Sequence, residues 1–475
     1  MSTARPPAPA GLLTYGTPVG RGVLWATVLG SGMAQLDASV INVALPAIGA
    51  DLGAGLTSLQ WTVNAYTLTL SGLLLLGGSL GDRLGRRRIF EIGTIWFTLA
   101  SIGCGLAPTP AVLIGMRALQ GVGAALLTPG SLAILQAVFR KQDRSTAVGA
   151  WSGLGGIASA LGPVVGGLLI GIGTGGWRLA FGINVPLAVA VIFLSRRFIP
   201  ESRDEQASGR LDVLGAVLAS LGLAALVWGL TEGPTTSWGV TTVLSLVAGA
   251  LLLVGFLLRQ RFAAHPLMPL ALFADRQFTA ANLVTLAVYA ALSGGLFLLP
   301  VQLQLVTGFS PVQAGSALLP ITLIMLAMSA RSGRMAGRIG PRLFMSAGPV
   351  VAGLGLALLS SIGPDTRYLT GVLPGVLVFG LGLAGTVAPL TSTVLAAAPN
   401  HWAGIASAVN NDVARVAGLL AVAVLPALAG LTNAAYADPV RFSAGFHRAV
   451  LIAAALCAAG GILAALTIRN PAPSD

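Results

Sequence analysis

Long apolar runs, separated by short polar loops, repeat along the whole chain of 475 residues. Each run is close to the ~20 residues that a helix needs to cross the hydrocarbon core of a bilayer. The short apolar–polar alternation that marks the strands of a membrane β-barrel is absent from the sequence. The pattern therefore predicts about fourteen membrane-spanning helices. Their expected limits are 22–45, 59–80, 89–107, 111–138, 146–172, 177–198, 212–231, 239–258, 279–301, 312–332, 343–362, 368–396, 403–432 and 446–468.

The composition agrees with an all-α integral membrane protein. Hydrophobic residues make up 55% of the chain and charged residues 9%, with a mean hydropathy of +0.86, whereas a soluble domain carries roughly 25% charged residues. Cys104 and Cys457 fall within apolar spans, so we expect two buried thiols and no disulfide. The first 20 residues are rich in Pro, Gly and Ala, which predicts a short tail and no cleavable signal peptide.

Positive charge is concentrated in alternate loops. With the N-terminus in the cytoplasm, about 21 of the 27 Lys and Arg residues lie in cytoplasmic segments, such as GDRLGRRR and RSGRMAGRIGPR, as the positive-inside rule requires. We therefore expect a multi-pass protein of the cell (inner) membrane with both termini in the cytoplasm. The net charge of +12 then suits anionic lipid headgroups, and we expect no nucleic-acid partner.

Two cytoplasmic loops repeat one motif. GSLGDRLGRRRIF (78–90) and GRMAGRIGPRLF (333–344) share the frame G-x-x-x-x-R-x-G-x-R, and parallel repeats of six spans are a known transporter architecture. The repeat predicts four parts, which are a tail at 1–21, a six-helix bundle at 22–198, a linker with two additional spans at 199–277 and a second bundle with a short tail at 278–475. In the second loop Gly337 replaces Asp82, so the two halves are not equivalent.

Four motifs and one further stretch resemble the major facilitator superfamily, in its branch of fourteen-span drug:proton antiporters. They are LDASVINVALP (36–46), GSLGDRLGRRR (78–88), LIGMRALQGVGAA (113–125), ASALGPVVGGLL (158–169) and WRLAFGINVP (177–186), the last with Leu179 where the family has a second tryptophan. The resemblance implies the major facilitator fold, with two six-helix bundles plus two extra transmembrane helices.

The loop motif is a candidate conformational latch. Gly78 and Gly85 allow a tight turn, and Arg83 and Arg86 hold the loop in the cytoplasm. The resemblance implies that Asp82 meets a helix N-terminus near 403–404 in the other half, where the helix dipole favours a carboxylate by about 0.3–1 kcal/mol. The alternative is a loop that serves only to set the topology.

The fifth span carries a row of small residues, formed by Ala158, Gly162 and Gly166 with Gly167 beside it. Such rows let helices approach closely, and Pro163 removes a backbone donor and can kink the helix. The resemblance implies a sliding contact that accompanies export. Ordinary helix packing is the alternative.

Four charged residues that lie well inside predicted spans are the proton-coupling candidates. A carboxylate at Asp37 costs about 2.5–3.5 kcal/mol if it faces lipid, so it needs a polar lining or a function. Arg117 either reaches the membrane surface or, as the resemblance implies, assists proton transfer. Asp412 and Arg415 share one helix face and form either part of an ion path or an ion pair that satisfies itself.

Other polar residues in the spans are weaker candidates for a substrate cavity. They are Asn64, Tyr66, Gln120, Tyr289, Gln302, Asn410 and Asn411. FGLGLAG (379–385) lies within a span, so its G-x-G-x-x-G pattern does not indicate dinucleotide binding, and no Walker A loop is present. No Cys/His cluster has metal-ligand spacing, so we expect no metal and no catalytic residues.

These observations predict a proton-coupled exporter of amphipathic, preferably cationic, small molecules, which works by alternating access and is not an enzyme. The cation preference assumes that Arg415 neutralises Asp412 and leaves Asp37 free. The expected partners are a small-molecule substrate, protons and membrane lipids, with the proton gradient in place of a cofactor and the monomer as the working unit. Alternatives are an exporter of a specific lipid, sugar or natural product, an importer on the same fold, and a non-transporting sensor or assembly subunit.

Overall fold

The structure is a computed structural model that describes residues 13–173, 175–204, 212–263, 266–399 and 402–470. Within these ranges the chain is helical, apart from turns and one isolated bridge between Leu13 and Phe139. The elements are α1 (Pro18–Leu52), α2 (Leu56–Leu84), α3 (Arg86–Gly105), α4 (Pro110–Val138), α5 (Arg144–Ile170), α6 (Gly176–Gly182), α7 (Asn184–Phe198), α8 (Val213–Glu232), α9 (Val240–Phe262), η1 (Leu270–Ala274), α10 (Arg276–Leu305), α11 (Pro311–Ser316), α12 (Leu319–Ile339), α13 (Pro341–Leu359), η2 (Tyr368–Val372), α14 (Leu373–Ala396), α15 (Ala403–Leu428), α16 (Asn433–Tyr436) and α17 (Pro439–Thr467).

Local sequence explains where many helices begin. Thr17, Thr109 and Ser310 each accept a hydrogen bond from the first turn and each precede a proline. A hydroxyl at the N-cap satisfies a backbone N–H that has no helical partner, and proline at the first helical position already has a helical φ and lacks the N–H that would be unpaired there. These helix starts are therefore encoded in three or four neighbouring residues.

The expected spans correspond to helices of the structure. In the described part of the chain, thirteen helical segments are long and apolar enough to cross a membrane. The span expected at 89–107 forms α3, which is not among the thirteen because it begins with three arginines and contains Glu91. It nevertheless packs closely along α4, since a Cβ added to Gly93 would lie 2.8 Å from the backbone nitrogen of Leu127. The prediction of about fourteen spans is thus confirmed.

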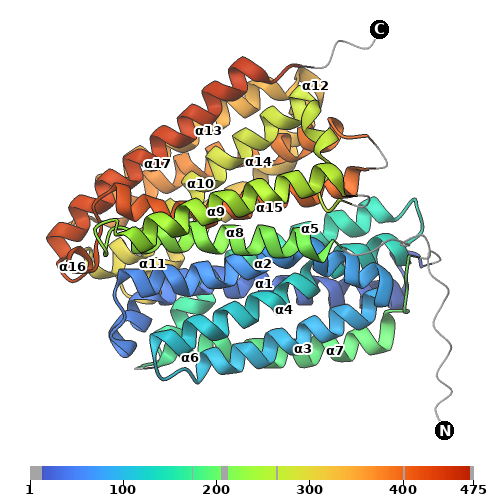
Figure 1. Cartoon of the computed structure of the whole chain (residues 1–475), viewed down its shortest axis with the longest axis horizontal. Coiled ribbons are helices and arrows are strands. Elements are labelled where there is room, and N and C mark those ends of the chain that lie inside the picture. The colour runs from blue at the N-terminus through green and yellow to red at the C-terminus, as the bar shows by residue number, and fades with distance from the viewer. Residues whose placement is uncertain (1–12, 174, 205–211, 264–265, 400–401, 471–475) are drawn as a thin grey trace.

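The helices form two groups with a hairpin between them (Figure 1). In the view of Figure 1, most of α1 to α7 lies in the lower part and most of α10 to α17 in the upper part, with α11 and α16 toward the left near mid-height, while α8 and α9 cross the middle. The hairpin α8–α9 covers the seam where α2 meets α15, because Leu223 and Val227 of α8 pack against Leu419 and Ala423 of α15.

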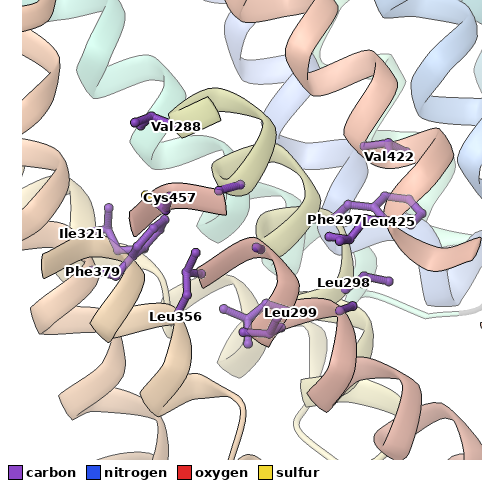
Figure 2. Close-up of a cluster of buried hydrophobic side chains, with 14 of the residues drawn as sticks. Val288, Phe297, Leu298, Leu299, Ile321, Leu356, Phe379, Val422, Leu425 and Cys457 are labelled. Carbon is purple, nitrogen blue, oxygen red and sulfur yellow. The ribbon is translucent and has the colours of Figure 1, made fainter. Parts of the chain in front are cut away.

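The second group has a continuous apolar core. Figure 2 shows Phe297 of α10 beside Leu425 of α15, and Ile321 of α12 near Phe379 of α14. Cys457 of α17 is buried in the same core, and Cys104 is buried in the first group. Both thiols are free, as the sequence predicts.

Direct contacts between the two groups concentrate at one end of the molecule. The described part of the chain begins and ends at the right of Figure 1, a side that we call the termini end, and α6, α11 and α16 lie at the opposite, far end. At the far end Gln304 donates to the Val43 carbonyl at 3.0 Å and Gln60 donates to the Val422 carbonyl at 2.7 Å. These hydrogen bonds tie the far ends of the two groups together.

Candidate functional site

A cavity of about 750 Å³ separates the two groups toward the termini end. Its first wall comes from α1, α2, α4 and α5, and its second wall from α15. Tyr66 and Arg415 line it near the middle of their helices, and Asp82 and Gly404 line it where α2 ends and α15 begins. A space of this volume suits a drug-sized ligand. The cavity therefore reaches from mid-membrane depth to the termini end, while the far end is closed.

Asp37 lies at mid-depth on α1, directly behind the cavity wall. Its side chain is 2% exposed and forms an ion pair with Arg117 at 2.5 Å. The other carboxylate oxygen accepts hydrogen bonds from Gln120 at 2.8 Å and from Asn184 at 3.1 Å. All three partners donate, so both oxygens of an ionised carboxylate are satisfied. This is the condition under which a buried charge is tolerated.

Arg117 is completely buried and does not reach the membrane surface. Besides Asp37, it donates to the Thr62 carbonyl at 3.0 Å and to the Gln120 side-chain oxygen at 2.6 Å. Its guanidinium carbon lies 4.4 Å from the centre of the Tyr66 ring, a distance that allows a cation–π interaction. Because Tyr66 lines the cavity, one aromatic ring separates the buried ion pair from the cavity space.

Asn184 completes this network and was missed from the sequence. It begins α7, and its amide nitrogen donates to both Asp37 and the Ser101 hydroxyl, the latter at 2.9 Å. It lies within the stretch WRLAFGINVP, where a lone asparagine among apolar residues was the available signal. Four helices, α1, α3, α4 and α7, therefore meet through polar side chains at one depth.

Asp412 and Arg415 do not form the ion pair that was one of the two alternatives for them. Among the ion pairs of the described residues there is none between them. One carboxylate oxygen of Asp412 is buried without a hydrogen-bond partner, whereas Arg415 lines the cavity. The hypothesis of a pair that satisfies itself is wrong for this conformation, because no ion pair joins the two side chains, although the charge of Arg415 still acts on Asp412.

The loop motif is held by local contacts. Asp82 pairs with Arg86 at 2.8 Å, and the carboxylate of Glu201 accepts the backbone N–H groups that begin α3, at 3.1 and 3.2 Å. Gly85 has φ +114° at the turn between α2 and α3, a conformation that favours glycine. Gly78 packs beside Pro129, and Arg83 lines the cavity mouth. Asp82 and Gly404 line the same cavity. The carboxylate and the helix N-terminus that the latch would bring together therefore lie on the same cavity.

The small-residue row of α5 lies between α1 and α11. A Cβ added to Gly166 would lie 2.8 Å from the Val40 side chain, and one added to Gly167 would lie 2.6 Å from the Pro311 carbonyl. In return, Gly315 of α11 approaches the Pro163 carbonyl so closely that no side chain fits. Gly162 lies against Ser39, and Ala158 lies near Gly32. The motif thus joins the two groups at the far end.

The weaker cavity candidates fall into several different environments. Tyr66 and Asn411 line the cavity, and Gln120 belongs to the Asp37 network. Gln302 and Asn410 serve contacts within the second group, since Gln302 donates to Ile362 and Ser443 while Asn410 donates to Asn282 and Thr285. Tyr289 packs against the apolar core of that group. Asn64 is fully buried, and neither of its side-chain polar atoms has a partner among the described residues.

Two groups of membrane-spanning helices around a cavity that opens toward one end are the architecture of a secondary transporter. Comparison with known proteins gives the family. The model of the Major Facilitator Superfamily matches residues 27–422, and the chain belongs to this superfamily of membrane transporters.

Relatives and solved structures agree with this assignment. The chain is 36% identical to the tetracenomycin C resistance and export protein of Streptomyces glaucescens, over 90% of this chain and 80% of that protein. It is 39% identical to the cephamycin export protein of Amycolatopsis lactamdurans, over 83% and 82% of the two chains. A bacterial homologue of the human lysosomal transporter Spinster has the same fold, with a TM-score of 0.67 at 17% identity over 96% of this chain and all of that one.

Proposed function

We propose that this protein is a proton-coupled exporter that moves amphipathic small molecules of antibiotic type out of the cell. The observation that supports this proposal most directly is the buried Asp37–Arg117 ion pair, which lies behind the wall of a cavity that is closed at the far end. Export of tetracenomycin C and of cephamycin by relatives supports a substrate of this type. The Arg-rich loops support a cytoplasmic termini end, in the cell (inner) membrane. We further propose that the monomer is the working unit and that it has no enzymatic activity and no cofactor.

In this proposal the structure corresponds to the inward-open state. The substrate enters the cavity from the cytoplasm, and Asp37 is ionised because each of its three partners donates to it. When the far end opens, a proton from outside neutralises Asp37 and weakens its hold on Arg117. The return of the proton to the cytoplasm restores the pair, so each cycle couples inward proton movement to outward substrate movement. The two six-helix bundles, 22–198 and 278–475, move as the rocking units, and 199–277 links them.

Asp37→Asn tests the proposed coupling, because the amide keeps the shape of the side chain but cannot take up a proton. We expect proteoliposomes with this variant to lose transport of tetracenomycin C or cephamycin driven by an imposed pH gradient. Asp365→Asn, at an exposed far-end turn, is the matched control and should transport like the wild type. Undiminished gradient-driven transport by a correctly inserted Asp37→Asn variant would refute the role of Asp37.

A further inference from the structure

The charge inside the cavity is opposite to the sequence-based expectation. Arg415 is the thirteenth residue of the 26-residue helix α15 and lines the cavity at mid-depth. The other charged residues that line the described cavity are Asp82, Arg83 and Asp212. Asp82 and Arg83 belong to the last turn of α2, and Asp212 precedes α8 and is paired with Arg259. A ligand deep in the cavity therefore meets a cation.

Neither buried acid forms an ion pair with this cation. Asp37 has both oxygens occupied by donors and is not part of the cavity lining. Asp412 lies beyond ion-pair distance from Arg415 and does not line the cavity either, although the two charges still interact. A cationic ligand at this depth would find no available carboxylate among the described residues. The premise of the cation preference, that Arg415 neutralises Asp412, does not hold in this structure.

Two further hydrogen-bond donors in the cavity wall lack partners. The indole N–H of Trp151 on α5 and the hydroxyl of Thr128 on α4 are buried atoms without a hydrogen-bond partner among the described residues, and both residues line the cavity. Asn411 precedes Arg415 by one helical turn and lines it too. Buried donors without partners cost free energy. Both polar atoms are covered in this conformation, so a ligand acceptor satisfies them only after these side chains turn toward the cavity. The rest of this wall includes leucines of α2 and α4, which suit an apolar body.

We infer that Arg415, Trp151 and Thr128 form an anion subsite, and that the substrate is an amphipathic organic anion, with an apolar body and a carboxylate or phenolate group. This inference rests on the proposed function, since it names the substrate class of the proposed export cavity. Arg415 pairs with the anionic group, the Trp151 and Thr128 donors orient it, and the apolar wall accepts the body. Charge-assisted hydrogen bonds of this kind are the stronger ones in proteins.

The test measures binding without transport, with a matched pair of fluorescent probes. The purified full-length protein, in nanodiscs of zwitterionic lipid, is titrated at pH 7.5 with 4-(1-pyrenyl)butyrate and with 4-(1-pyrenyl)butylamine, which share an apolar body and differ in charge. We expect the carboxylate to bind more tightly. Arg415→Gln should weaken carboxylate binding about tenfold and leave amine binding unchanged or stronger. Arg415→Lys should retain the preference, and Trp151→Phe should weaken carboxylate binding alone.

Controls separate this inference from simpler explanations and from the proposed function. Arg367→Gln removes an exposed far-end charge and should leave both affinities at the wild-type value. Equal wild-type affinity for the two probes, or an equal loss of both in Arg415→Gln, overturns the subsite. Displacement of the carboxylate by anionic phospholipid in the nanodisc overturns the small-molecule assignment in favour of a lipid headgroup. If the protein binds the carboxylate selectively but shows no transport driven by a pH gradient, the proposed exporter function is contradicted and the anion subsite is supported. If the protein exports the amine in preference to the carboxylate, only the anion subsite is contradicted.

Discussion

At the scale of single residues, the ion pair between Asp37 and Arg117 has the largest cost of desolvation. Both charges are removed from water, and the desolvation of two ions is repaid only if their geometry is good and every remaining donor and acceptor is used. Here Thr62, Gln120 and Asn184 complete the pairing. The ion pair is therefore stable only while both members are present. This dependence suits the proposed cycle, in which Asp37 is protonated and then gives up the proton again.

A double-mutant cycle tests this dependence. Asp37→Asn and Arg117→Gln should each lower the stability of the detergent-solubilised protein by about 3–5 kcal/mol, because each leaves one buried charge unpaired. The double variant should lose less than the sum of the two single variants, since no lone charge remains. Thermal unfolding, followed by fluorescence, measures all three. Additive losses would show that the two side chains act independently.

At the scale of secondary-structure elements, the hairpin α8–α9 is tied to the cavity mouth by one carboxylate. Asp212 caps α8 through the Gly215 N–H at 3.0 Å, pairs with Arg259 at 3.0 Å and accepts from Gln260 at 2.9 Å. Gln260 also accepts the backbone N–H of Met268 at 3.0 Å. Because Asp212 and Leu267 both line the cavity, these bonds hold the start of α8 and the segment after α9 at the cavity mouth.

The pH dependence of this tie follows from the pKa of Asp212. Burial opposes ionisation, but hydrogen bonds from Arg259, the Gly215 N–H and Gln260 outweigh it and lower the pKa below its ordinary value. Because the pKa is lowered, ionised Asp212 stabilises the folded protein at pH values above its unfolded-state pKa of about 3.9. This stabilisation is lost as the pH falls through the folded-state pKa. Asp212→Asn should thus cost about 1–2 kcal/mol at pH 7 and progressively less below pH 4. Thermal unfolding at both pH values checks this, and a pH-independent difference would contradict it.

The far-end contact of α5 with α11 is a second feature at this scale. Gly167→Ala would place a methyl group 2.6 Å from the Pro311 carbonyl, whereas the same change at Gly156 of α5 meets no atom within 4 Å. We expect Gly167→Ala to open the far end more often and to slow export several-fold, while Gly156→Ala transports normally. Transport rates of the two variants in proteoliposomes provide the comparison. Equal rates would mean that the small-residue row serves packing only.

At the scale of the whole molecule, alternating access predicts that one end of the cavity is reachable at a time. The far end is held by hydrogen bonds between the two groups, and the cavity extends to the termini end. The native thiols, Cys104 and Cys457, are buried, so a single introduced cysteine can report which side reaches the cavity.

Ser407→Cys places that thiol on the cavity wall. A membrane-impermeant maleimide should label it from the cytoplasmic side, in inside-out vesicles, and much more weakly from the outside of intact cells. Ser361→Cys, at an exposed far-end turn, should show the opposite preference. Reversal of both results would place the termini outside, and equal labelling of Ser407→Cys from both sides would contradict a closed far end.

The sequence by itself determined the number, length and class of the spanning elements, because a backbone in lipid must satisfy its hydrogen bonds within the helix. Helix starts such as Thr17–Pro18 and Ser310–Pro311, and the depth of Asp37, are likewise local properties. The partners of the buried charges are not local. Asp37 and Arg117 are 80 residues apart, and Arg415 faces the cavity while Asp412, three residues away, does not.

Only the tertiary structure decided which partners the buried charges have. Helix periodicity shows which residues share a helix face, but the packing of the helices determines which residues that face contacts. The rotation of α4 and α7 against α1 brings Arg117 and Asn184 to one carboxylate, and the position of α15 places Arg415 at the cavity. The same packing lays α8 over the seam between α2 and α15. The charge that a substrate meets is therefore a property of the assembled helices and not of any single span.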